Sequence, residues 1–159
     1  MTTQWRWCIS LVLGILALLF TASLATAQGY VDANNLSEAA GMLRAQGVTL
    51  GTFEELCAHG FPDRGPVLSR AVVKWKRDHE RVIEAADKFV QRMIRSTGRD
   101  PTPTLEASLR RLATQQFRSL GIDAQRRYCE QLPAELESGA WDSRTPNVYR
   151  FLEEYANEP

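Results

Sequence analysis

The chain has 159 residues and carries 19 basic and 19 acidic side chains, so its formal net charge is zero. This balance gives no overall attraction to nucleic acid or to a membrane surface. The length suits one globular domain, which would bury enough apolar surface to fold without a metal ion.

The first 27 residues have the three parts of a secretory signal peptide. Arg6 supplies a basic start, residues 9–20 are almost wholly apolar, and Ala25-Thr26-Ala27 is a small-residue cleavage site. An uncleaved membrane anchor is the alternative, but the apolar run is shorter than the roughly 20 residues that a membrane-spanning helix needs. We therefore predict cleavage after Ala27 and export, to the periplasm in a bacterial cell, with no membrane span in the mature chain.

Two cysteines, Cys57 and Cys129, remain after this cleavage. An even number of cysteines in an exported protein favours a disulfide. Such a bridge closes a long loop, for which the chain-entropy description assigns about 4 kcal/mol of stabilisation. The alternative makes Cys57 a nucleophile beside His59, and an oxidising compartment with a second cysteine at hand disfavours it. The sequence predicts a Cys57–Cys129 disulfide.

The mature chain begins with a polar segment, residues 28–35, which we predict to be a flexible leader before a single helical domain over residues 36–159. Residues 36–46 have a helical pattern that a glycine ends. Residues 52–60 have a capping-box start and a glycine stop. They are therefore predicted to form a second, short helix that carries the first cysteine.

The longest predicted element is one helix over residues 66–97. Apolar positions recur at alternating steps of four and three for seven turns, and no proline or glycine interrupts them between Val67 and Thr97. Further helices are indicated after residues 102, 123 and 145, and no strand-like alternation is evident. The predicted fold is all-α, with five or six helices packed around this long central helix and one disulfide.

His79 lies on the apolar face of that predicted helix, four residues after Trp75. The favoured interpretation is a mostly buried histidine that bonds to a neighbouring helix. The alternative is the general base of a hydrolase-type enzyme. The chain has no nucleophile elbow, no H-E-x-x-H pair and no glycine loop for phosphate. We therefore assign no catalytic residue, metal ion or cofactor, and an enzyme is the less favoured class.

Basic side chains on the same predicted helix share its alternating spacing, roughly opposite the apolar face. They form a candidate face for an anionic partner, which would be an acidic protein, a lipid headgroup or a polyanion. The predicted basic face consists of Arg70, Lys74, Arg77, Arg81, Lys88 and Arg92. A solvated helix face is the alternative, and the acidic C-terminal region, residues 130–159, could also cover it. Nucleic acid is disfavoured as a partner because export removes the chain from most nucleic acids.

These features indicate a small exported helical protein that binds a protein partner in the cell envelope and does not catalyse a reaction. Inhibitor, immunity and chaperone-like roles all fit such a domain, although architecture alone is a weak guide to function. Two alternatives stay open: a carrier that holds a small apolar ligand between its helices, and an enzyme that uses His79.

Overall fold

The computed structural model describes residues 31–158, so the predicted signal peptide lies outside the described residues. The described part contains six α-helices and one short 3-10 helix, and no strand occurs within it. The α-helices are Leu36–Gly60 (α2), Gly65–Asp78 (α3), Glu80–Thr97 (α4), Thr102–Ser119 (α5), Ile122–Glu137 (α6) and Pro146–Ala156 (α7), and the 3-10 helix η1 spans Asp142–Arg144. The predicted all-α class and the number of helices are confirmed.

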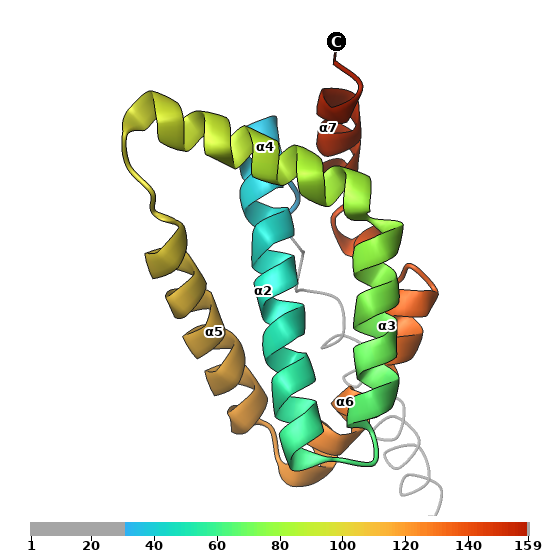
Figure 1. Ribbon diagram of the computed structural model, residues 1–159. Coiled ribbons are helices and arrows are strands. Elements are labelled where there is room, and N and C mark those ends of the chain that lie inside the picture. The colour runs from blue at the N-terminus through green and yellow to red at the C-terminus, as the bar shows by residue number, and fades with distance from the viewer. Residues whose placement is uncertain (1–30, 159) are drawn as a thin grey trace, which may run out of the picture. The chain divides into compact units, whose positions relative to one another are not determined.

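The central element is α2, which packs against each of the other five α-helices (Figure 1). Asn35 caps its start, because the Asn35 side chain accepts a hydrogen bond from the backbone N–H of Glu38 at 2.9 Å. The buried face of α2 includes Ala39, Ala40, Leu43, Leu50, Phe53 and Cys57. The sequence predicted that residues 66–97 form the central helix, whereas in the structure the central helix is α2.

Gly47, where the sequence predicted a helix end, and Gly51, in the predicted connection, both lie inside α2 with right-handed helical backbone. Each costs roughly 0.5–1 kcal/mol of helix stability relative to alanine. Most helix stability in proteins comes from tertiary packing, and the helices around α2 supply enough of it to hold one continuous helix here. The predicted break between residues 46 and 52 is therefore wrong.

The interior glycines of α2 lead to a prediction about stability. A Cβ atom built at Gly41, Gly47 or Gly51 would meet no atom within 4 Å. Each Gly→Ala substitution should raise the free energy of unfolding by about 0.5–1 kcal/mol, measured by urea denaturation. Gly65→Ala is the control that should destabilise, because its Cβ would lie 2.8 Å from Ala58 Cα. A loss of stability at any of the three α2 positions would contradict the open space around them.

The helix predicted over residues 66–97 is two helices, α3 and α4, which meet at a sharp bend at His79 (Figure 1). The backbone of His79 has φ −109° and ψ 13°. Its ring Nδ1 lies 2.8 Å from the carbonyl oxygen of Trp75, where it competes with the regular helical hydrogen bonding. A side chain that engages the backbone ladder in this way is a known cause of helix bending. The single-helix prediction is wrong at this residue.

The Cys57–Cys129 disulfide is confirmed, and it joins α2 to α6. The two cysteines are 0% and 1% exposed, so the bridge lies inside the core. None of the described helices has the length and apolar character needed to cross a membrane.

The last residues of the predicted leader are held against the domain. Ala33 is fully buried, and the Asp32 carboxylate accepts a hydrogen bond from the backbone N–H of Asn147 at 3.0 Å. The compact helical unit begins at Asp32, four residues before the predicted domain start at residue 36.

Candidate functional site

A polar cluster fixes the bend between α3 and α4. Its centre is the carboxylate of Asp142, in η1. Asp142 Oδ1 accepts hydrogen bonds from Trp75 Nε1 at 2.8 Å and from the Tyr149 hydroxyl at 2.7 Å. Asp142 Oδ2 lies 3.3 Å from His79 Nε2. The cluster therefore connects α3, the bend, η1 and α7.

The geometry of the His79 ring favours its protonated form. The Trp75 carbonyl oxygen can only accept a hydrogen bond, so Nδ1 must carry a proton. Nε2 faces a carboxylate oxygen, so a proton is favoured there as well. The hydrogen bond to Asp142 raises the pKa of His79 above its ordinary value, against the opposing effect of burial. Burial opposes ionisation of Asp142, but hydrogen bonds from His79, Trp75 and Tyr149 outweigh it and lower the Asp142 pKa.

Both nitrogens of His79 are thus engaged within the chain. A hollow of about 360 Å³ lies beside the ring, but neither nitrogen is free to take a proton from a molecule placed there. A general base needs such a free nitrogen within hydrogen-bond reach of its substrate. The interpretation of His79 as a structural residue fits this geometry. Asp142, which engages Nε2, and Tyr149, whose ring centre lies 5.1 Å from that of His79, carry no sequence signal that links them to this histidine.

The bend divides the candidate basic face between two helices. All six side chains are exposed: Arg70, Lys74 and Arg77 on α3, and Arg81, Lys88 and Arg92 on α4. On α3, Lys74 forms an ion pair with Asp78, and Arg77 lies 4.0 Å from the same carboxylate. The basic face is therefore not one straight stripe, and one acidic side chain partly balances its α3 half.

The α4 half of the basic face lies next to α7. Arg81 donates a hydrogen bond to the side-chain oxygen of Asn157, and the Arg92 guanidinium lies 5.5 Å from the centre of the Tyr155 ring. The C-terminal helix and the residue that caps it therefore contact two of these basic side chains. The contacts are made by an amide and an aromatic ring, not by the acidic side chains of α7. Binding of an anionic partner to the remaining bases stays a prediction.

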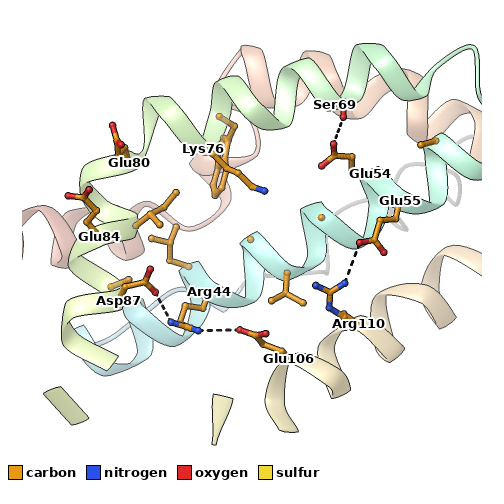
Figure 2. Close-up of a pocket in the computed structure, with 18 residues that line it drawn as sticks. Arg44, Glu54, Glu55, Ser69, Lys76, Glu80, Glu84, Asp87, Glu106 and Arg110 are labelled. Atoms are coloured by element: carbon orange, nitrogen blue, oxygen red, sulfur yellow. Dashed lines mark hydrogen bonds and ion pairs between the residues drawn. The ribbon is translucent and has the colours of Figure 1, made fainter. Parts of the chain in front are cut away.

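A groove of about 850 Å³ runs along one side of α2 (Figure 2). α2 forms its floor, α3 and α4 form one wall, and α5 contributes the other. The small and apolar lining residues include Leu43, Gly47, Val48, Gly51, Ala58 and Ile83. A Cβ atom built on either glycine would have no atom of residues 31–158 within 4 Å, outside the local helix backbone.

Acidic side chains outnumber basic ones around this groove by two to one. The carboxylates are Glu54, Glu55, Glu80, Glu84, Asp87 and Glu106, and the bases are Arg44, Lys76 and Arg110. The whole chain has no net charge, so this excess reflects a local segregation of charge. A hollow lined mainly by one sign of charge concentrates ions of the opposite sign.

Four of the six carboxylates already have partners. Arg44 lies 2.6 Å from Asp87 and 3.2 Å from Glu106, so it connects α2 to α4 and α5. Arg110 lies 3.4 Å from Glu55, and Glu54 accepts a hydrogen bond from Ser69. The remaining two, Glu80 and Glu84 on α4, have no ion pair among residues 31–158.

Glu80 and Glu84 lie one turn apart at the N-terminal end of α4, and both are exposed (Figure 2). The sequence did not indicate these two glutamates as site residues, because glutamates on a predicted helix are typical of a solvent-exposed face. Only the bend at His79 and the continuity of α2 bring them to the same groove as Gly47 and Gly51.

Comparison with known proteins gives no match to a family model, to a curated protein or to a solved structure. Within residues 31–158, no three histidine, cysteine, aspartate or glutamate side chains gather as a metal site would require. Function therefore has to be inferred from the chain's own residues.

Proposed function

We propose that this protein is a binding protein whose ligand occupies the groove beside α2, and that the ligand combines an apolar surface with positive charge. The proposal rests on one observation: the floor of the groove is lined by small and apolar residues, and carboxylates outnumber basic side chains around its rim. The volume of about 850 Å³ lies within the range of about 300–1,000 Å³ typical of ligand sites.

Export is a part of this proposal. A buried disulfide between α2 and α6 suits an oxidising compartment, and the N-terminal sequence has the order of a signal peptide. The ligand would accordingly be met outside the cytoplasm, in the periplasm of a bacterial cell.

The groove favours a cationic, partly apolar ligand over the two alternatives, which are a hydrolase that uses His79 and a carrier of an uncharged apolar ligand. The hydrolase hypothesis depends on His79, and both nitrogens of that ring bond within the chain. The carrier hypothesis places a purely apolar ligand between the helices. The groove differs, because its acidic rim gives a cationic ligand an advantage that an uncharged one lacks.

Calorimetric titration of the oxidised protein tests the proposal, with an alkylammonium ion and an alkyl sulfate of equal chain length, both below their micelle concentrations. The alkylammonium ion should bind, and its affinity should fall as salt rises, because salt screens the carboxylates. Replacing Glu80 and Glu84 together with glutamine should weaken alkylammonium binding about tenfold and should not weaken any binding of the alkyl sulfate, which the carboxylates repel.

Arg77→Gln, on the basic face outside the groove, is the control and should leave alkylammonium binding intact. Equal binding of the two amphiphiles, or an affinity for alkylammonium that does not change in the double glutamine variant, would refute the proposal.

A further inference from the structure

We infer that the natural occupant of the groove is a basic amphipathic α-helix of another protein, lying along α2. This inference rests on the proposed function and specifies the class of ligand. It follows from the length of the groove, from its glycine floor and from the spacing of its unpaired carboxylates.

The groove is long enough for several helical turns. Its floor runs along α2 from Leu43 to Ala58. At 1.5 Å per residue this is about 22 Å, or roughly four turns of helix. Figure 2 shows its lining side chains spread along α2 between two flanking helices. An elongated groove between helices is the site that amphipathic helices occupy in other complexes.

The floor allows another backbone to approach closely. Gly47 and Gly51 lie one turn apart on α2, and the space where each Cβ would be is empty. The distance between packed helices depends on the side chains at their contact, and glycine gives the shortest approach. α3 and α5 both pack on α2 and make at most marginal contact with each other. A helix seated between them would complete the bundle on this side.

The carboxylates on the α4 wall suit a helix with regularly spaced bases. Glu80 and Glu84 are four residues apart and have no ion pair among the described residues. Lysine or arginine side chains four residues apart on a partner helix would have matching spacing. Lys76 is the one base in the groove without an ion pair in the described range, and Figure 2 shows it directed between the walls. It would lie beside the partner and favour an acid or a neutral residue there.

The test uses designed peptides of about 16 residues. In the first peptide, alanine and leucine form one face of the helix, and lysines four residues apart flank that face. The second peptide has the same composition in scrambled order. We expect the amphipathic peptide to bind the oxidised protein at least about tenfold more tightly than the scrambled peptide and to gain helical circular dichroism on binding.

Variants of α2 give a matched control. Gly51→Leu places a side chain in the groove and should abolish peptide binding, whereas Gly41→Leu is on α2 outside the groove and should not. Leucine is the better helix former, so both variants should be at least as stable as the parent, which thermal unfolding checks. Full peptide affinity in Gly51→Leu would overturn the inference.

The remaining outcomes separate this inference from the proposed function. Equal affinity of the two peptides, or binding of the alkylammonium ion alone, would overturn the helical occupant and leave a groove that binds small cationic ligands. If neither the peptides nor the alkylammonium ion bind, both the helical occupant and the proposed function are overturned.

Discussion

Removal of the Cys57–Cys129 disulfide is expected to lower the free energy of unfolding by about 4 kcal/mol. The bridge joins cysteines 72 residues apart, so its loss frees a long loop in the unfolded chain. Its loss also removes the main link between α6 and α2, because α6 packs mainly on α3 and has only a small direct contact with α2. Urea denaturation of the oxidised protein and of a Cys57→Ala, Cys129→Ala variant measures the difference.

The control for this experiment is a reducing agent, which should destabilise the parent protein and leave the double alanine variant unchanged. The two sulfur atoms are buried, so the substitution also removes packing, and the reduced parent separates this effect from loss of the cross-link. A difference below about 1 kcal/mol would contradict the role assigned to the bridge.

Replacing Asp142 with alanine is expected to cost about 2–4 kcal/mol, because the change leaves several donors without their shared acceptor. Trp75 Nε1 and His79 Nε2 would both lose it, whereas the Tyr149 hydroxyl keeps a second acceptor in Gln46, at 3.0 Å. Urea denaturation measures the loss. Asp142→Asn should cost less, since its amide oxygen still accepts hydrogen bonds. Equal stability of the parent and the alanine variant would show that the cluster does not hold the bend.

The same cluster predicts a pH dependence of stability. The folded-state pKa of His79 is raised above its ordinary value of 6.5. Its contribution is therefore fully present below pH 6.5 and is lost as the pH rises through the raised value. The folded-state pKa of Asp142 lies below its ordinary 3.8, so its contribution is present above pH 3.8 and is lost as the pH falls through the lowered value.

Comparison of the parent with His79→Gln by urea denaturation at about pH 5 and about pH 8.5 tests this assignment. The stability advantage of the parent should be largest at the lower pH and should shrink at the higher one. An advantage that stays constant, or that grows with pH, would mean that His79 is not held as a cation by Asp142.

The sequence allowed correct prediction of features that depend on local chemistry. The even number of cysteines in the mature chain indicated the bridge between Cys57 and Cys129, and helical periodicity indicated the all-α class. The predicted helix end at residue 97 is also found, and Gly98, which follows α4, has a left-handed backbone. These features need only the compartment and the nearest neighbours along the chain.

Features that depend on tertiary contact could not be predicted in this way. Gly47 and Gly51 have a local preference to end a helix, which the packing around α2 overrides. At the bend, the His79 ring is held by Asp142, 63 residues further along, as well as by the Trp75 carbonyl. The groove depends on both effects at once, so no single segment of the sequence contains its pattern.

The most direct test of the proposed groove is to record amide shifts of the isotope-labelled, oxidised protein by NMR while it is titrated with the alkylammonium ion. The account predicts saturable shifts at Gly47 and Gly51, in the groove, with Gly41 on the same helix unaffected. Shifts that leave Gly47 and Gly51 unchanged, or that gather on the basic face at Arg70 and Arg77, would contradict it.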